Sequence, residues 1–128
     1  MTKIFNSLEE IQKYYNKESN TYIFKEYGMY INLVIFNFDL NVKSNIYGWN
    51  IYGRNISALN INAKDICVCY LDANDIKAHD INAANINANN ISYYAVCYAY
   101  ENIKCKSIKG RKYNSKHFAL DGHIYIDG

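Results

Sequence analysis

A branched aliphatic residue recurs at every fifth position through the middle of the chain. A small residue follows most of these by two positions, as Ala63 follows Ile61, and Asn or Asp precedes most of them by one, as Asn60 does. An α-helix repeats every ~3.6 residues and a strand every ~2, so neither produces this pattern. A strict period of five predicts a solenoid of short, similar steps. The aliphatic series is Ile46, Ile51, Ile56, Ile61, Ile66, Leu71, Ile76, Ile81, Ile86, Ile91 and Val96.

The steps are expected to close into a coil of four sides, with one five-residue step on each side. Ile and the Ala that follows it would point into the core, and Asn or Asp would lie at the corners, where the side chain bonds local backbone groups. Successive turns would stack about 4.8 Å apart. Corner residues on neighbouring turns would then form two ladders, Asn45–Asp65–Asn85 and Asn55–Asp75.

Residues 45–100 resemble a pentapeptide-repeat protein, a family that folds as a right-handed quadrilateral β-helix. The family motif reads small residue, Asn or Asp, large aliphatic residue and two variable residues. Asp65 before Ile66 matches it, but the small residue Ala63 lies three positions before Ile66 instead of two. The resemblance implies an all-β, right-handed solenoid with its large and small core positions exchanged. The chain also resembles uncharacterised small proteins of low-GC bacteria and their mobile elements.

The N-terminal flank, residues 1–44, is expected to cap the coil with a short helix and strands. Ser7 and Glu10 have the spacing of a capping box, which predicts an amphipathic helix within the first twenty residues. Strands are expected over residues 21–43, the first beginning at Tyr22, with a turn at Gly28.

The C-terminal flank, residues 101–128, is expected to add a partial coil and a second cap. The repeat of residues 45–100 slips after Val96 and resumes weakly at Ile103. Asp121-Gly122 lies between short apolar stretches, which predicts a terminal hairpin over residues 117–127.

Composition indicates a cellular compartment for the protein but does not indicate its activity. The chain has 128 residues and a net charge of +2. We find no signal-peptide pattern and no apolar run of membrane-spanning length, so a cytoplasmic protein without membrane contact is expected. Its four cysteines do not form the pattern of a secreted disulfide framework, so reduced thiols are expected. Frequent Ile, Asn, Lys and Tyr use AT-rich codons and favour an AT-rich genome.

Charge is concentrated near the C-terminus, where residues 102–120 contain basic side chains and no acidic ones. Tyr113 is interleaved with these basic residues. One interpretation is a contact with nucleic acid phosphates or an acidic protein surface. The other is a solvated loop that caps the coil, and the sequence leaves both open. The basic residues are Lys104, Lys106, Lys109, Arg111, Lys112 and Lys116.

Aromatic residues at outward positions of the repeat indicate a second candidate surface. Such side chains often mark an interface, including one between two copies of a chain. They can also pack beneath the N-terminal cap. The residues are Tyr47, Trp49, Tyr52 and Tyr94.

We identify no catalytic or metal site in the sequence, and we expect no cofactor. Cys67 and Cys69 point outward in the expected register, but no further ligand lies at metal-binding spacing. Cys105 could pair with His117 or His123 as nucleophile and base, but nothing in the sequence orients them.

Two functions remain from different classes. The first is a non-enzymatic protein that binds a host protein or ribonucleoprotein, such as a phage or mobile-element inhibitor of a host nuclease of the anti-CRISPR kind. The second is a self-associating structural solenoid, for example a homodimer. The pentapeptide-repeat resemblance adds a gyrase-directed mimic of duplex DNA. That role needs a strongly acidic face, which the mostly amide corners of this repeat do not supply.

Overall fold

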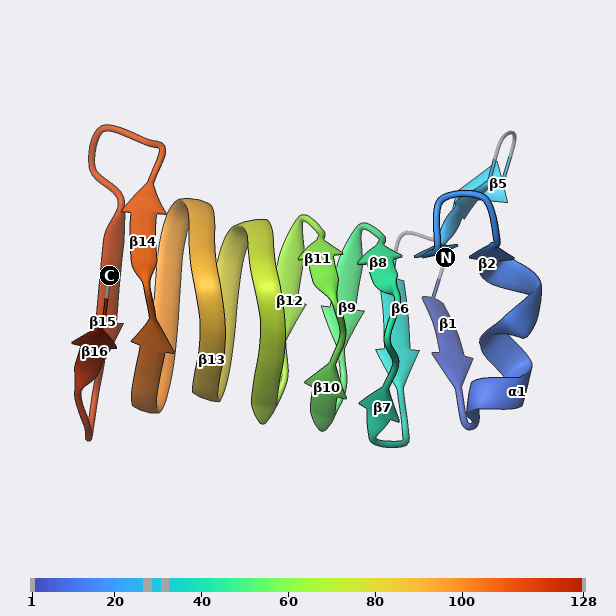
Figure 1. Ribbon diagram of the computed structural model, residues 1–128, viewed down its shortest axis with the longest axis horizontal. Coiled ribbons are helices and arrows are strands. Elements are labelled where there is room, and N and C mark those ends of the chain that lie inside the picture. Colours follow the sequence, from blue (N-terminus) through green and yellow to red (C-terminus); the bar gives the residue numbers. More distant parts are fainter. Residues whose placement is uncertain (1, 27–28, 31–32, 128) are drawn as a thin grey trace.

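A computed structural model describes residues 2–26, 29–30 and 33–127, and it shows an all-β solenoid of about five turns. The coil lies along the long axis in Figure 1, with the short helix at one end and the last strands at the other. The N-terminal elements are β1 (Thr2–Phe5), α1 (Leu8–Ile11), the 3₁₀ helix η1 (Gln12–Tyr14), β2 (Tyr15–Asn16), β3 (Thr21–Ile23), β4 (Lys25–Glu26), β5 (Met29–Tyr30), β6 (Leu33–Phe36) and β7 (Leu40–Asn41).

The coil itself consists of short strands that join into one long strand wound around the axis. Its elements are β8 (Asn45–Tyr47), β9 (Asn50–Tyr52), β10 (Asn55–Ser57), β11 (Asn60–Asn62), β12 (Asp65–Cys67), β13 (Tyr70–Cys105), β14 (Ser107–Gly110), β15 (Lys116–Ala119) and β16 (Ile124–Ile126).

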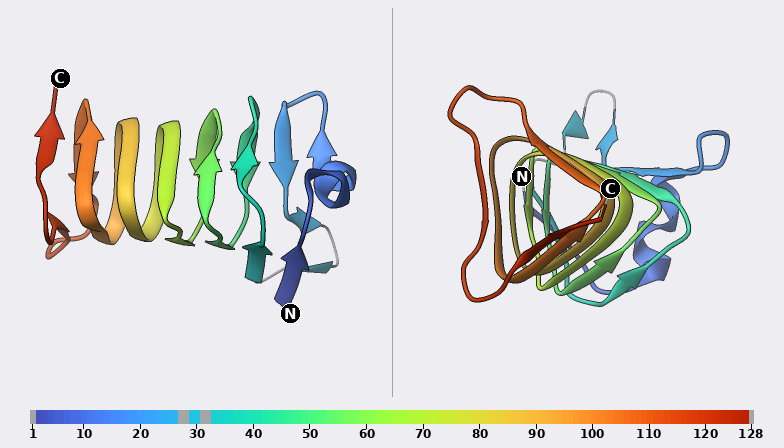
Figure 2. Two further views of the ribbon diagram at one scale, coloured as in Figure 1. Left: turned by 90° about the horizontal axis from the view of Figure 1, so that it is seen from below. Right: turned by 60° about the vertical axis from the view of Figure 1, so that its left-hand side comes forward.

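Each turn has three sides, so the prediction of four sides is wrong. β12 pairs in parallel with β9 and β13, which places Ile66 between Ile51 and Ile81. Equivalent residues in these regular turns are therefore 15 positions apart, and Figure 2 shows a triangular cross-section. The five-residue period sets the length of one side but carries no information on the number of sides. The four-sided prediction came from the quadrilateral geometry of the resembled family.

The three sides form three flat faces. Face A contains β3, β8, β11, residues 75–77 and 90–93 of β13, and β14. Face B contains β1, β6, β9, β12, residues 80–82 and 96–99 of β13, and β15. Face C contains β7, β10, residues 70–72 and 103–105 of β13, and β16.

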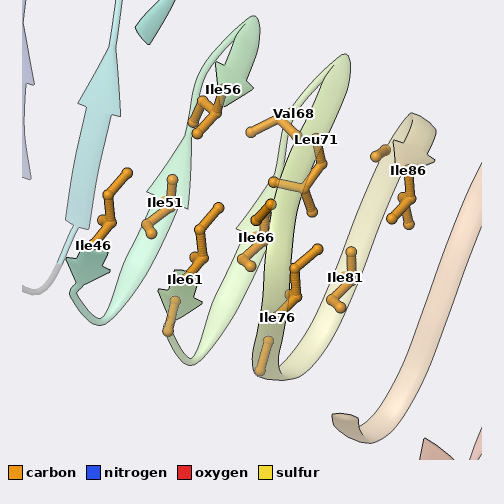
Figure 3. Packing of buried hydrophobic residues seen from close by; sticks show 14 of the residues in the cluster. Ile46, Ile51, Ile56, Ile61, Ile66, Val68, Leu71, Ile76, Ile81 and Ile86 are labelled. Atoms are coloured by element: carbon orange, nitrogen blue, oxygen red, sulfur yellow. The ribbon is translucent and has the colours of Figure 1, made fainter. Parts of the chain in front are cut away.

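Ile and Ala fill the interior, as predicted. Ile76 and Ala78 are each 1% exposed, and the same two positions are buried in most other steps. Figure 3 shows the stacked aliphatic side chains that line the inside of successive turns. Burial of one such Ile contributes about 1.5–3 kcal/mol, so repetition of the step accumulates a continuous core.

A ladder of side-chain hydrogen bonds follows the first residues of the face A strands. Asn60 Nδ2 donates to Asn45 Oδ1 at 3.0 Å, and the backbone N–H of Asp75 donates to Asn60 Oδ1 at 3.1 Å. Asn90 Nδ2 donates to Asp75 Oδ1 at 2.8 Å, and Ser107 Oγ donates to Asn90 Oδ1 at 2.7 Å. The predicted ladders are wrong because they paired residues that begin strands on different faces.

The turns lengthen toward the C-terminal end, where the five-residue period is interrupted. Val96 is 37% exposed and Cys97 takes the core position, so the expected place of Val96 in the core is wrong. One extra residue lies between the core residues Tyr93 and Cys97 and a second between Ala99 and Ile103, because each pair is four positions apart where a regular step leaves three. Partners on neighbouring turns are then 17 residues apart at Asn90 and Ser107, and 21 apart at Ile103 and Ile124.

The N-terminal end is closed by a cluster of aromatic rings from the cap and the first turn. Phe5, Tyr14, Phe24 and Phe36 are buried, and their neighbouring ring centroids lie 5.3–5.8 Å apart. The cap contains the predicted helix and strands, but the helix is short because the chain passes into the 3₁₀ helix η1 at Gln12 and into β2 at Tyr15. Residues 2–5 also form a strand, which pairs with β6.

The predicted capping box forms only in part. Ser7 is the N-cap residue, but its side chain makes no capping hydrogen bond. Glu10 Oε2 instead accepts a 2.9 Å hydrogen bond from the backbone N–H of Asn6. Gly28, expected at a turn, lies outside the described residues.

The prediction of a terminal hairpin is also wrong, because β15 and β16 do not pair with each other. Each pairs in parallel with β13 and forms one side of the last turn. The Asp121-Gly122 signal marks the corner between them. In the described residues, α1 and η1 are the helices, and neither is long and apolar enough to cross a membrane.

Candidate polyanion-binding face

The three-sided turn brings basic and aromatic side chains from distant parts of the chain together on face A. The outward positions of its strands form one column, in which Asn62 lies between Tyr47 and Lys77, and Ser92 lies beside Lys109. A second column runs along the corner that follows face A. We call the two together the aromatic–cationic face, defined by Tyr47, Trp49, Lys64, Lys77, His79, Tyr94, Lys109 and Arg111.

Backbone hydrogen bonds fix the corner column from turn to turn. The N–H of Lys64 donates to the carbonyl of Trp49 at 2.6 Å, and the N–H of His79 donates to the carbonyl of Lys64 at 2.7 Å. The N–H of Lys112 donates to the carbonyl of Tyr94 at 3.1 Å. Backbone hydrogen bonds therefore hold Trp49, Lys64 and His79 in line from turn to turn, and Lys112 lies in the segment between β14 and β15.

The side chains of the corner column also stack on one another. Lys64 Nζ lies 5.6 Å from the ring centroid of Trp49, and the rings of His79 and Tyr94 are 5.1 Å apart at 32°. Arg111 Cζ lies 5.9 Å from the centroid of Tyr94, and Arg111 Nη2 donates a 2.9 Å hydrogen bond to the carbonyl of Ala78. Cation–π attraction thus restrains the charged groups before any ligand arrives.

An open depression of about 550 Å³ lies between the two columns, and none of the described residues that line it is acidic. Four of them, Lys64, Lys77, His79 and Arg111, carry basic side chains. Tyr47, Gly48, Trp49, Asn62 and Ala63 complete the lining. This arrangement attracts anions.

Carboxylates lie at both edges of this face. Asp65 and Asp80 are paired in register at the start of the face B strands, just beyond the corner column. Burial and the neighbouring Asp80 raise the pKa of Asp65, while Lys64 and His79 act in the opposite direction. Asp75, at the other edge, accepts a hydrogen bond from Asn90 within the ladder.

The basic C-terminal segment does not form one patch. Lys104 lies on face C, with its Nζ 5.9 Å from the ring centroid of Tyr125, and Lys116 lies on face B. Lys106 is at the corner that precedes face A, and Lys112 follows Arg111 at the corner after it. The segment therefore encircles the last turn, and only two of its members, Lys109 and Arg111, belong to the aromatic–cationic face.

The predicted aromatic residues are also divided between faces. Tyr47, Trp49 and Tyr94 belong to the aromatic–cationic face, and Tyr52 lies on face B beside Cys67. Tyr113 is fully exposed between β14 and β15.

Sequence reasoning missed Lys64, Lys77 and His79, which complete the face. A four-sided turn assigned them to other surfaces. Writing the repeat in rows of 15 residues instead of 20 places Trp49, Lys64, His79 and Tyr94 in one column, and that alignment would have revealed the face.

The cysteines and the remaining histidines lie apart from this face. Cys67 and Cys69 are exposed as predicted, whereas Cys97 and Cys105 are buried. Burial raises the pKa of the Cys97 thiol to about 12. His117 Nδ1 is 2.6 Å from the hydroxyl oxygen of Tyr93. Among the described residues, no group of three or more His, Cys, Asp or Glu side chains is placed to hold a metal ion.

No protein-family model, curated protein or solved structure matches the chain. The β-solenoid with its many Asn-containing strands is compatible with a repeat β-helix, and no family match confirms a pentapeptide repeat.

Proposed function

We propose that this chain is a binding protein without catalytic chemistry, which presents the aromatic–cationic face to an acidic macromolecule. The observation that carries the proposal is the convergence of Lys64, Lys77, Lys109 and Arg111 from separate turns onto one face. A surface of one charge sign raises the local concentration and the association rate of an oppositely charged partner.

The scaffold supports a binding role because it holds the face in one geometry. Backbone bonds link each turn to the next, and Arg111 is anchored to Ala78. A surface that is already ordered loses less conformational entropy when it binds. Trp, Tyr and Arg, which are all present here, are also the residues that most often dominate binding energy at interfaces.

Protection of strand edges offers a structural explanation for some of these charges, but not for all. In the described residues, β14, β15 and β16 pair only with β13, so each leaves one edge open. Lysines such as Lys109 and Lys116 on such strands discourage edge-to-edge association. Lys64 and Lys77 lie inside the array, where no strand edge is open, so edge protection does not explain them.

Matched charge reversals test the proposal. The variant K64E/K77E changes the aromatic–cationic face, and K104E/K116E makes the same charge change on faces C and B. Each protein, with the wild type, serves as bait in a lysate of a low-GC bacterium. We expect a partner that the wild type and K104E/K116E retain and K64E/K77E loses. Identical captures by all three baits would contradict the proposal.

The cellular role remains a prediction. A mobile-element inhibitor of a host nuclease would use this face to block an acidic partner, and the described free cysteines are compatible with a reducing cytoplasm. The positive sign of the face disfavours the gyrase-directed DNA mimic, which would need acidic charge. An effect of the purified chain on a host nuclease, lost in K64E/K77E, would support the inhibitor role.

Self-association is a second candidate, because β14, β15 and β16 each leave an edge open in the described residues, although Lys109 and Lys116 oppose pairing there. Two copies could join these edges about a twofold axis. Light scattering coupled to size-exclusion chromatography tests this, because a dimer that resists dilution would support it. A monomer at all concentrations would exclude it.

A further inference from the structure

We infer that the aromatic–cationic face binds the sugar–phosphate backbone of a nucleic acid strand and does not read its bases. The inference rests on the proposed function, because it names the chemical class of the acidic partner. It is drawn from the width of the charged strip, the chemistry between the charges and the basic side chains that pack against the aromatic rings.

The charged strip has the width of one backbone strand. Neighbouring turns are about 4.8 Å apart, so Lys64 and Arg111, three turns apart, span about 14 Å along the coil. The two columns are two residues apart within each turn, which is about 6.6 Å in extended chain. A strip this long and narrow fits one line of phosphates better than two strands separated by a major groove of about 12 Å.

The groups between the cations are hydrogen-bonding groups and not aliphatic ones. Tyr47, Asn62 and Ser92 share the strand column with the lysines. Among the described residues that line the depression, Ala63 has the one aliphatic side chain, and it is buried. Protein–protein interfaces commonly have an apolar core, whereas phosphates receive hydrogen bonds from Lys, Arg, Ser, Asn and Tyr. This chemistry favours a nucleic acid over an acidic protein.

Basic side chains already pack against two of the aromatic rings. His79 and Arg111 come from the turns on either side of Tyr94, and both pack on its ring. Lys64 lies over the ring of Trp49. Tyr47 and Tyr94 are still 40% and 41% exposed, but a base that stacked on either ring would add little preference for sequence, because every base offers a π-face. Binding should therefore be largely independent of base sequence.

Salt dependence gives the inference a quantitative form. Four contacts, from Lys64, Lys77, Lys109 and Arg111, predict a slope of log K against log salt of about −3 for a single strand and about −3.6 for duplex DNA. Removal of two contacts should reduce the steepness of the single-strand slope by about 1.4.

Fluorescence anisotropy with labelled 20-nucleotide oligo-dT, oligo-dA and their duplex tests the inference, with poly-glutamate as a separate polyanion. K64E/K77E should weaken binding of nucleic acid about tenfold or more and reduce the salt slope, whereas K104E/K116E should change affinity less than about threefold. Oligo-dT and oligo-dA should bind within about threefold of each other. The duplex shows whether one strand of a double helix is also accepted. Lys64 and Lys77 are exposed, so both variants should fold, which circular dichroism verifies.

Different failures have different meanings. Binding of poly-glutamate that depends on the face, without binding of nucleic acid, would overturn the inference and leave the proposed function standing. A strong preference for one base would overturn the claim that bases are not read. If K64E/K77E binds every polyanion as the wild type does, or if the wild type binds none, the inference and the proposed function are overturned together.

Discussion

An engineered disulfide at Cys67 can test the three-sided turn directly. Cys67 is exposed on face B, and its partner on the next turn is the exposed Asn82. We propose Asn82→Cys in a Cys69→Ser background, which removes the neighbouring exposed thiol. Paired Cα atoms on neighbouring turns should lie about 4.8 Å apart, within the range of about 4.4–6.8 Å that a disulfide spans. Both side chains point outward, so a bond should form on mild oxidation.

The register determines how much this bond should stabilise the protein. It closes a loop of 15 residues, because Cys67 and Asn82 are paired in register. A loop of that length raises the free energy of unfolding by about 3 kcal/mol if the native geometry is unstrained. With a urea dependence of about 1–3 kcal/mol per molar, the unfolding midpoint of the oxidised form should rise by about 1–3 M over the reduced form.

The matched control is Asn87→Cys in the same background. Asn87 is also an exposed Asn of β13, and it lies 20 residues after Cys67, where a four-sided turn would place the partner. Thiol titration, peptide mass mapping and a non-reducing gel at low protein concentration identify the bond and exclude cross-linking between molecules. A disulfide that forms readily at residue 87 and not at residue 82 would refute the three-sided turn.

Three further predictions concern the core, the ladder and the paired carboxylates. Ile76→Ala should lower the free energy of unfolding by about 2–5 kcal/mol, because Ile76 is 1% exposed, whereas Lys77→Ala should change it by less than about 0.5 kcal/mol in urea titrations. Asn60→Ala removes two ladder hydrogen bonds and should cost about 1–3 kcal/mol, and a cost indistinguishable from zero would show that the ladder does not stabilise the coil. Asp65 has a raised pKa, so the folded state binds its proton more tightly and stability should fall as the pH rises above about 3.8. Asp65→Asn, which places at this position the residue found one turn earlier at Asn50, should flatten that fall, and an unchanged pH profile of thermal unfolding would contradict this.

The core was predictable because a buried side chain leaves a periodic mark in the sequence. Ile61 and Ala63 are buried as their spacing indicates. The number of sides leaves no such mark, because a step of five residues fits a triangle or a square. The hairpin signal at Asp121-Gly122 was misread because a turn-forming pair suits a solenoid corner as well as a hairpin. The strand at residues 2–5 was missed because its partner, β6, is distant in the sequence.

The candidate site was predictable only in its parts. Lys109, Arg111, Tyr47, Trp49 and Tyr94 were recognised as candidates, but they were assigned to two separate surfaces. Their union depends on the 15-residue turn, which also brings in residues from the middle of the repeat. Basic residues that are neighbours in the sequence therefore identified the basic C-terminal segment. Basic residues that are neighbours on successive turns identify the aromatic–cationic face.

Lysine footprinting tests the central claim most directly. Acetylation of the protein alone and with oligo-dT, followed by mass spectrometry, reports which lysines a polyanion covers. We predict joint protection of Lys64, Lys77 and Lys109, with Lys104 and Lys116 still reactive. Protection of Lys104, Lys109 and Lys116, with Lys64 and Lys77 still reactive, would show that the terminal basic segment binds alone and would contradict the aromatic–cationic face.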